Sequence, residues 1–366
     1  MQIQKYPIVY RGTVKNVREV KACSDRSAGL AIFEFSSDSS IKDYGKLPFE
    51  TPFKGEDICA MAVKSFAEIE ALGISTIFIE QISPTAILVQ LVDVLDPSKN
   101  DLRKIQSNRL IPLDCIIRNV ITATSSARKR LQNGSLHPSA VGLSKVPNSY
   151  PVILPKMFFD GSTKLGITDE YLQWDELKSL SGESSELLNE VDLQTRRIGQ
   201  YALKKGASSG LLINDFKVEW ALNETGDLML ADVPLAMDEI TSAYCGDPFA
   251  SVDELNPELP IFVPGINHSH ESYVNVSKQI YRDHYTASEP EWCRELEKAK
   301  EAKLGKSNYP KPTAPPEELI QLVSEMFAGL RNLWTPENPR KAIPLGESTK
   351  AYKTWANQFY KLENVS

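Results

Sequence analysis

The chain has 366 residues, of which 42% are hydrophobic and 24% charged, and a formal net charge of −7. This length fits two domains or one large two-lobed domain of ordinary globular composition. The negative charge argues against a nucleic-acid partner, because phosphate backbones select basic surfaces, and no apolar run approaches the roughly 20 residues that span a bilayer.

The N-terminus and the cysteines indicate a cytoplasmic protein. Residues 1–10 lack the basic stretch and apolar core of a secretory signal. The five cysteines are scattered and show no C-x-x-C spacing, which predicts reduced, mostly buried thiols. The four histidines lack the spacing of metal ligands, which argues against a zinc site.

Residues 1–108 are predicted to form a strand-rich N-terminal lobe. Strands are expected over four apolar runs, at 8–10, 30–35, 76–79 and 86–92. One helix is expected between the second and third run, where apolar residues recur at helical spacing: Ile58, Ala62, Phe66, Ile69 and Leu72. The polar residues 93–108 predict a connector.

Two loops of this lobe are candidate binding sites. Gly12 lies in a turn between two β runs, where it would let the backbone approach a phosphate that Lys15 could neutralise. A glycine between strands is more often only a turn. Asp38 and Ser40 follow the strand that ends at Phe35, in a polar loop of a common kind.

Residues 109–285 are predicted to form a central lobe, with a buried strand at 111–121 and helices at 168–180 and 183–205. Arg118 interrupts the apolar strand, and burying it is costly without an anionic partner. That partner is either a ligand or an Asp or Glu of the chain. Hydroxyl residues at 122–126 then lead into a helix start suited to binding phosphate.

A hairpin follows, with turn-forming residues at 223–227. Alternation places Asp215, Lys217 and Glu219 on one face of its first strand. A turn centred between residues 225 and 226 would make Glu219 and Asp232 direct cross-strand neighbours. Two such carboxylates repel unless a cation lies between them, and a lysine beside them suits magnesium carrying a nucleotide phosphate. A polar, solvated hairpin face is the alternative.

The chain from residue 275 onward is predicted to be helical, and its residues 286–366 are predicted to form a helical C-terminal extension. Helices are expected at 275–285, 290–303, 315–334 and 348–362, separated by a Lys/Pro-rich linker at 304–316 and a proline-containing loop at 334–344. Strands clustered apart from helices favour an α+β class with two lobes.

The order of these pieces resembles the SAICAR synthetase family (phosphoribosylaminoimidazole-succinocarboxamide synthase). Six or seven short motifs occur in the family's order between residues 8 and 285. The matching positions are 10–15; Asp38, Ser40 and Asp43; Lys54-Gly55; 112–118 with Ala123-Thr124; 162–164 with 168–170; 215–220 with Asp232; and 278–283. The resemblance implies an α+β fold of two lobes with antiparallel sheets, related to ATP-grasp and kinase-like nucleotide-binding folds.

The resemblance also implies an activity. Members are ATP-dependent carbon–nitrogen ligases of purine biosynthesis, which join aspartate to carboxyaminoimidazole ribonucleotide (CAIR) through an acyl phosphate. ATP and Mg²⁺ are the implied cofactors, CAIR and aspartate the implied small-molecule partners, and a homo-oligomer is left open. On this basis residues 1–108 would be the nucleotide-binding lobe and 109–285 would carry the substrate and metal sites.

The motifs imply roles for individual residues. The catalytic residues would be Lys217 and Asp215, and the magnesium ligands Glu219 and Asp232. ATP would be bound by Arg11, Gly12, Lys15 and Lys217. The substrates would be bound by Asp38, Ser40, Arg118, Thr124, Ser125, Lys164, Asp169, Lys278 and Arg282.

The chain departs from the family pattern at several of these positions. The first lysine of the phosphate loop is Thr13 here, and an arginine that contacts the substrate phosphate in the family is Thr241. A threonine cannot replace a fixed, bidentate cation. Residues 249–272 are additional sequence. Two alternatives therefore stay open: a paralogous ATP-dependent amide ligase acting on a different carboxylate, and a non-catalytic nucleotide-binding protein.

Overall fold

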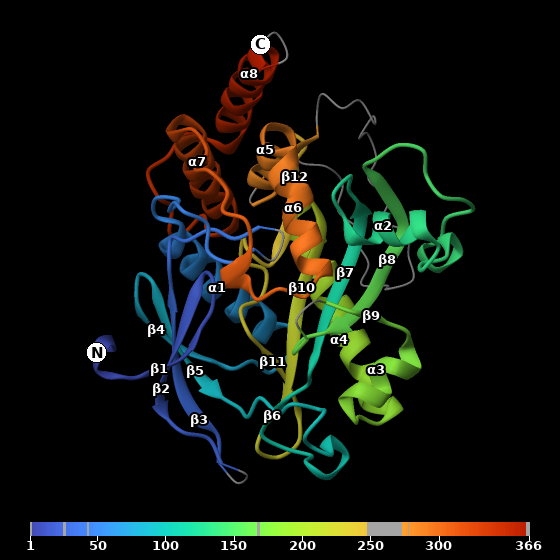
Figure 1. Cartoon of the computed structure of the whole chain (residues 1–366). Helices are drawn as coiled ribbons and strands as arrows, with labels where there is room; N and C mark the ends of the chain where they lie inside the picture. Colours follow the sequence, from blue (N-terminus) through green and yellow to red (C-terminus); the bar gives the residue numbers. More distant parts are fainter. Residues whose placement is uncertain are drawn as a thin grey trace.

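The computed structural model describes residues 2–24, 27–41, 44–166, 169–246, 273–276 and 278–363. Two antiparallel sheets and a set of packed helices make up these parts, which confirms the α+β class (Figure 1). The additional sequence at 249–272 lies outside the described residues, and so do Asp43 and Thr168 of the family motifs.

The first sheet has five strands in the order β1-β2-β3-β5-β4. The strands are β1 (Ile8–Arg11), β2 (Lys15–Lys21), β3 (Gly29–Phe35), β4 (Phe78–Ser83) and β5 (Ala86–Leu91). Helix α1 (Lys54–Ala71) covers one face, because its apolar stripe, which includes Ile58, Phe66 and Ile69, is buried. The predicted strands and helix of this lobe are confirmed, with β4 placed two residues later than expected.

The second sheet follows the order β13-β12-β10-β7-β8-β9, and β11 and β6 also pair with β10. Its strands are β6 (Arg109–Leu110), β7 (Leu113–Ile121), β8 (Val152–Thr163), β9 (Tyr171–Leu172), β10 (Leu211–Leu222), β11 (Leu228–Ala231), β12 (Ile240–Tyr244) and β13 (Val274–Val276). Every residue of β7 is buried, as its apolar run predicted. Helix α4 (Ser185–Ala207) packs on the back of β10 and β7.

Gly199 makes the close packing of α4 on the sheet feasible. A Cβ at this position would lie 3.0 Å from the sulfur of Met157 and 3.3 Å from the ring of Phe216. A larger residue would therefore push the helix away from the strands. The opposite face of the sheet stays open to polar side chains, and the candidate site lies there.

The remaining helices are α2 (Ser126–Asn133), α3 (Trp174–Ser181), α5 (Gln279–Ser288), α6 (Pro290–Glu301), α7 (Glu317–Trp334) and α8 (Leu345–Glu363). Helix α7 packs on α1, and α8 packs on α7, so the C-terminal extension is joined to the first lobe (Figure 1). A buried cluster in which Asp57 pairs with Arg331 and Arg340 supports this contact. None of the helices in the described ranges is long and apolar enough to cross a membrane.

Two predicted helix starts are wrong, and the strands that were not predicted include β8, β9, β12 and β13. The helix expected from residue 168 begins at Trp174, because Tyr171–Leu172 pairs with β8. The helix expected from 275 begins at Gln279, because Val274–Val276 pairs with β12. Strands β8 and β12 themselves lie beside the two central strands, β7 and β10.

Candidate active site

The candidate site lies on the open face of the second sheet, around the middle of β10. Asp215 faces Arg118 on β7 and Thr241 on β12, and Lys217 faces Ile116. Because side chains alternate along a strand, these pairings put Arg118, Asp215, Lys217 and Thr241 from three neighbouring strands on one face. The predicted grouping of Lys217 with Glu219 is confirmed, since the Lys217 amine donates to a Glu219 oxygen at 3.0 Å.

Glu219 lies in a cluster of lysines and carboxylates. Its carboxylate accepts hydrogen bonds from Lys164 and Lys217, and it is only 3% exposed. The Lys217 amine also lies 3.3 Å from Asp114 and 3.7 Å from Glu239. Each charge therefore has a partner of opposite sign, which offsets the cost of burial.

The ionisation of this cluster follows from burial and from these partners. Burial would raise the pKa of Glu219, but the lysines, first Lys164 and then Lys217, lower it to about 2. Burial would lower the pKa of Lys217, but neighbouring carboxylates, first Glu219, raise it well above its ordinary value. At neutral pH both groups are charged. Burial raises the pKa of Asp114 to about 6.

The predicted hairpin register is wrong by one residue. Glu219 faces Ala231 and not Asp232, because the turn closes with Leu222 opposite Leu228. Asp232 follows the strand with a φ of 58°, a left-handed conformation that takes its side chain out of the strand's alternation. Its carboxylate forms an ion pair with Lys15 from the first sheet.

Lys15 connects Asp232 to the cluster. Its amine also lies 4.5 Å from the ring centre of Phe33. Burial lowers the pKa of Lys15 to about 8, although Glu219 and Glu239 oppose this shift. The lysine predicted for the phosphate loop is therefore positioned between the two lobes, within electrostatic reach of Glu219 and Glu239.

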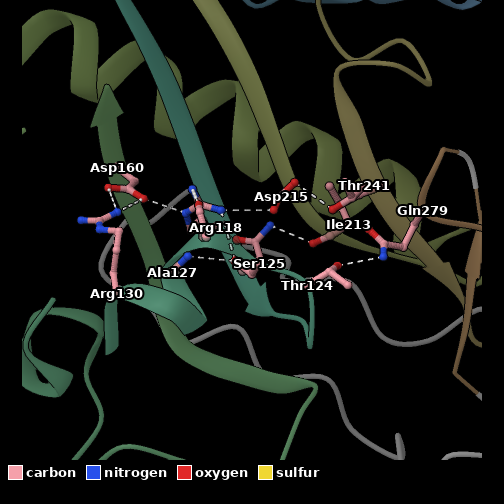
Figure 2. Close-up of polar contacts among 12 residues, drawn as sticks. Arg118, Thr124, Ser125, Ala127, Arg130, Asp160, Ile213, Asp215, Thr241 and Gln279 are labelled. Atoms are coloured by element: carbon pink, nitrogen blue, oxygen red, sulfur yellow. Dashed lines mark hydrogen bonds and ion pairs between the residues drawn. The ribbon is translucent and has the colours of Figure 1, made fainter. Parts of the chain in front are cut away.

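Arg118 forms the second part of the site. Its guanidinium donates to Asp160 at 2.7 Å and to Asp215 at 3.4 Å, and it is 4% exposed (Figure 2). The chain thus supplies the anionic partners that the sequence left open. The guanidinium also donates to two hydroxyls at the start of α2, to Ser125 at 3.4 Å and to Ser126 at 3.0 Å.

The start of α2 has the features of a phosphate site. Ser125 is the N-cap, and its hydroxyl accepts from the backbone N–H of Ala127. The free N–H groups and positive dipole of a helix start attract anions. The predicted helix start is confirmed, and it lies directly beside a buried arginine.

Helix α5 contacts the loop that precedes α2. The Gln279 amide donates to the Thr124 hydroxyl at 2.8 Å (Figure 2). Arg282 lies one turn further along α5, and its charge contributes to lowering the pKa of Lys278, after burial. The Lys278 amine donates to the backbone carbonyl of Asp238. Thr241 donates to Asp215 at 2.7 Å, so this position holds a carboxylate in place.

The other predicted substrate residues lie at the borders of these two clusters. Asp38 is buried and pairs with Lys46 at 2.7 Å, and Ser40 is half-buried in the same loop. Asp169 is exposed, and its charge contributes to raising the pKa of Asp114. Arg11 and Gly12 border a cavity at the tip of the β1–β2 turn.

Sequence reasoning missed several charged residues of the site. Asp160 lies on β8, which was not predicted, and it accepts from both Arg118 and Arg130. Asp114 has the same side-chain parity as Arg118 on β7, and that alternation could have identified it. Glu239 immediately precedes β12, which was also not predicted.

The carboxylates of this face could hold a divalent cation together with a phosphate. Four carboxylates form ion pairs with three lysines: Asp114, Glu219, Asp232 and Glu239 with Lys15, Lys164 and Lys217. Among the described residues no three His, Cys, Asp or Glu side chains form a ready-made metal site. Mg²⁺ commonly takes only one or two protein carboxylates and completes its shell with water and substrate phosphates, so Glu219 and Asp232 fit this donor set.

The chain is similar to one family of proteins over more than half of its length. The sequence model of the SAICAR synthetase family matches residues 8–240. A phosphoribosylaminoimidazole-succinocarboxamide synthase of Thermoplasma acidophilum is 30% identical over 232 residues, 63% of this chain and 74% of that protein. An Archaeoglobus fulgidus protein provisionally given the same enzyme name is 26% identical over 337 residues, 88% of this chain and 92% of that protein.

Solved structures resemble the fold. The Saccharomyces cerevisiae SAICAR synthase complexed with SAICAR has a TM-score of 0.61 and 18% identity, covering 93% of this chain and 98% of that chain. A type-2 SAICAR synthetase in complex with ADP has a TM-score of 0.53 and 18% identity, covering 83% and 99%. The coverage extends the likeness into the C-terminal helices.

Proposed function

Because the chain belongs to the SAICAR synthetase family, we propose that it is the ATP-dependent ligase that joins aspartate to CAIR to give SAICAR in purine biosynthesis. One structural observation supports this most. A lysine–carboxylate cluster and an arginine–helix-start cluster occupy the same open sheet face, because β10 places Asp215, which accepts from Arg118, two residues before Lys217, which donates to Glu219. In this proposal residues 1–108 bind the nucleotide, 109–285 carry the substrate and metal sites, and 286–366 are a helical extension.

The reaction needs two steps. A carboxylate oxygen of CAIR attacks the γ-phosphorus of ATP, which forms an acyl phosphate and releases ADP. The amine of aspartate then attacks the acyl carbon, loses a proton and expels phosphate, which leaves the amide. The first step places negative charge on the transferred group, so electrostatic stabilisation is the main contribution that the protein can make.

The lysine cluster suits the phosphates of ATP. Lys217 remains charged at neutral pH and would stabilise the transferred phosphoryl group, and Lys15 would neutralise the nucleotide from the first lobe. Glu219 and Asp232 would hold Mg²⁺, which supplies charge neutralisation at the β- and γ-phosphates when bound. Asp215 would act as a catalytic residue beside the CAIR carboxylate, and Lys164 would border it.

The start of α2 suits the phosphate of the ribonucleotide. Arg118, Thr124 and Ser125 present a cation, a hydroxyl and a helix start in one place. Lys278 and Arg282 would add the positive charge that the family obtains from the arginine replaced by Thr241. The Gln279–Thr124 hydrogen bond supports this arrangement, because it brings the first turn of α5 to the same loop.

A coupled ADP-release assay tests the proposal. With ATP, magnesium, aspartate and CAIR present, we expect ADP release and formation of the succinocarboxamide product in equal amounts. ATP-analogue binding without product from CAIR would instead favour the second candidate, a ligase for a different carboxylate. One observation favours that candidate: Thr241 stands where the family has a phosphate-binding arginine, and its hydroxyl donates to Asp215.

A further inference from the structure

A cavity of about 430 Å³ lies where the C-terminal extension meets the β1–β2 turn. Three segments line it: residues 10–13 of the turn, 44–46 of the loop that carries Asp38, and 306–307 of the linker between α6 and α7. The first two segments belong to the nucleotide-binding lobe of the proposed function. The third comes from the extension, to which neither the sequence motifs nor the family match assigns a role.

The cavity is positively charged. Arg11, Lys46 and Lys306 line it, and none of the described lining residues is acidic. Asp38 offsets the charge of Lys46 at 2.7 Å. Arg11 and Lys306 have no carboxylate partner among the described residues, and both side chains are exposed. Two uncompensated cations beside a phosphate loop attract a polyanion.

The linker is held in place beside the cavity although it has little regular structure. Tyr309 is buried, with its ring centre 6.5 Å from that of Tyr44, which itself lines the cavity. The Trp292 indole donates to the carbonyl of Pro310 at 2.8 Å, and its ring centre lies 5.7 Å from that of Tyr44. The Tyr285 hydroxyl donates to the next part of the linker, at Thr313, at 2.6 Å.

These contacts hold the backbone of the linker next to Lys306 in place without help from a ligand. Tyr44 packs against α6 through Trp292 and against the linker through Tyr309, so the Asp38 loop and the extension form one packed unit. Lys306 is only three residues from the buried Tyr309 and starts a short 3₁₀ turn. An ordered backbone reduces the entropy that a lysine loses when it binds an anion.

We propose that the C-terminal extension completes the nucleotide site, with Lys306 binding the β- and γ-phosphates of ATP from the side opposite Lys15. This inference rests on the proposed function, because it takes the ligand of the β1–β2 turn to be a nucleoside triphosphate. Arg11 acts with Lys306 across the cavity, while Lys15 points to Asp232 on the inner side of the turn. The extension is then part of the active site and not only a support for the first lobe.

The test is titration calorimetry of the full-length protein with a non-hydrolysable ATP analogue, ADP and AMP. For Lys306→Gln we expect the affinity for the analogue and for ADP to fall by about threefold to tenfold, the effect of one exposed charge-assisted contact, with AMP affinity unchanged. Lys306→Glu should weaken both further. Lys311→Gln is the matched control, since Lys311 is an exposed lysine of the same linker that does not line the cavity.

Two results would overturn the inference. The first is unchanged binding of all three nucleotides by Lys306→Gln. The second is an equal loss for AMP, which would assign Lys306 to the nucleoside end. Failure of the wild-type protein to bind any of the three would refute the proposed function itself, so the two failures are distinguishable.

Discussion

Burial and the neighbouring charges have opposite effects on the pKa of Glu219, and the effect of the charges is the larger one. Burial alone would favour the protonated acid, yet the lysines around it lower its pKa to about 2. The carboxylate therefore stays ionised and holds the amines of Lys164 and Lys217 in place before any phosphate arrives. Such preorganised charge costs no reorganisation during the reaction, which is how electrostatic catalysis gains its effect.

The first prediction concerns this carboxylate. Glu219→Gln keeps the shape but removes the charge, so we expect kcat/KM to fall by about 100-fold or more, as for removal of a preorganised electrostatic group. The control is Asp227→Asn, which neutralises a carboxylate in the exposed turn of the same hairpin. Activity within threefold of the wild type, with an unchanged thermal unfolding midpoint, would contradict the role of Glu219.

The second prediction concerns pH. Burial lowers the pKa of Lys15 to about 8, so the amine is charged below this pH and neutral above it. Lys217 stays charged over the same range because its pKa is raised. If Lys15 binds phosphate, KM for ATP should rise above pH 8, by up to about tenfold at pH 9.

Lys15→Arg provides the comparison, since a guanidinium keeps its charge throughout this range. Its KM for ATP should be flat between pH 7.5 and about 9.5, even if its absolute value is higher. A wild-type KM that is independent of pH, or an equal rise in the arginine variant, would assign the titration to another group.

For single residues, the sequence predicted several of the charged side chains of the candidate site, but not which of them face each other. Alternation on one strand grouped Lys217 with Glu219, a local property of extended backbone. The predicted pairing of Glu219 with Asp232 depended on where the turn is centred. A shift of one residue pairs Glu219 with Ala231 instead, because it moves every side chain of the second strand to the other face of the sheet. The partners Asp160 and Glu239 come from other parts of the chain, which no local pattern joins to β10.

At the level of the elements, helices α2 and α5 begin beside the same loop. The N-cap hydroxyl at Ser125 and the hydrogen bond from Gln279 to Thr124 place the two helix starts at one loop. Gln279 also donates to Asp283 on its own helix at 2.7 Å, which fixes the direction of its amide. The loop before α2 is therefore held by a residue that lies 155 positions away in the sequence.

The third prediction tests this contact. Gln279→Leu removes these two hydrogen bonds and the one that Arg282 donates to Gln279 at 3.4 Å, so the loop at Thr124 loses its support. KM for CAIR should rise by about threefold to tenfold, as for one or two net hydrogen bonds. KM for ATP should stay unchanged, because the nucleotide would bind at the lysine cluster. Thr286→Val on the exposed face of α5 is the control, since its hydroxyl bonds only to its own helix. Equal effects on both substrates would indicate a general loss of structure.

The elements that escaped prediction share a physical cause. β8 contains Pro155 and Lys156 within its apolar residues, and these break the alternation that identifies a strand. β12 is short and follows an irregular segment, and β13 has three residues. β8 and β12 form because β7 and β10 offer them unpaired backbone groups, and β13 forms on β12 in the same way. This is a tertiary effect that the sequence does not encode locally. The long amphipathic helices α1, α4 and α7 carry their own signal and were predicted.

For the whole molecule, a buried ion pair joins the two lobes behind the site. Lys54, at the start of α1 in the first lobe, is 1% exposed and lies 3.0 Å from the carboxylate of Asp238 in the second. Its amine also donates to the carbonyl of Asp38 at 2.7 Å. Nearby, the Thr51 and Tyr281 hydroxyls are 2.8 Å apart. The relative position of Lys15 and Glu219 depends on such contacts, because those two residues belong to different sheets.

The fourth prediction follows from the cost of leaving one of these charges alone. Lys54→Met should lower the free energy of unfolding by about 3–5 kcal/mol, because it removes the cation that lies 3.0 Å from the buried Asp238 carboxylate. Asp238→Asn should have a similar effect through Lys54. The double variant should lose less than the sum, since neither charge is then left unpaired. Denaturant unfolding of the four proteins measures this coupling.

Additive losses would show that the two residues act independently, and the pair would then not be what holds the lobes together. The matched control is the ion pair of Lys64 with Glu337, which also joins α1 to a later part of the chain but lies near the surface. Lys64→Met should cost about 1 kcal/mol or less, because water screens an exposed pair. A surface pair and a buried pair of the same chemistry then differ only in solvation, which assigns the larger loss at Lys54 to burial between the lobes.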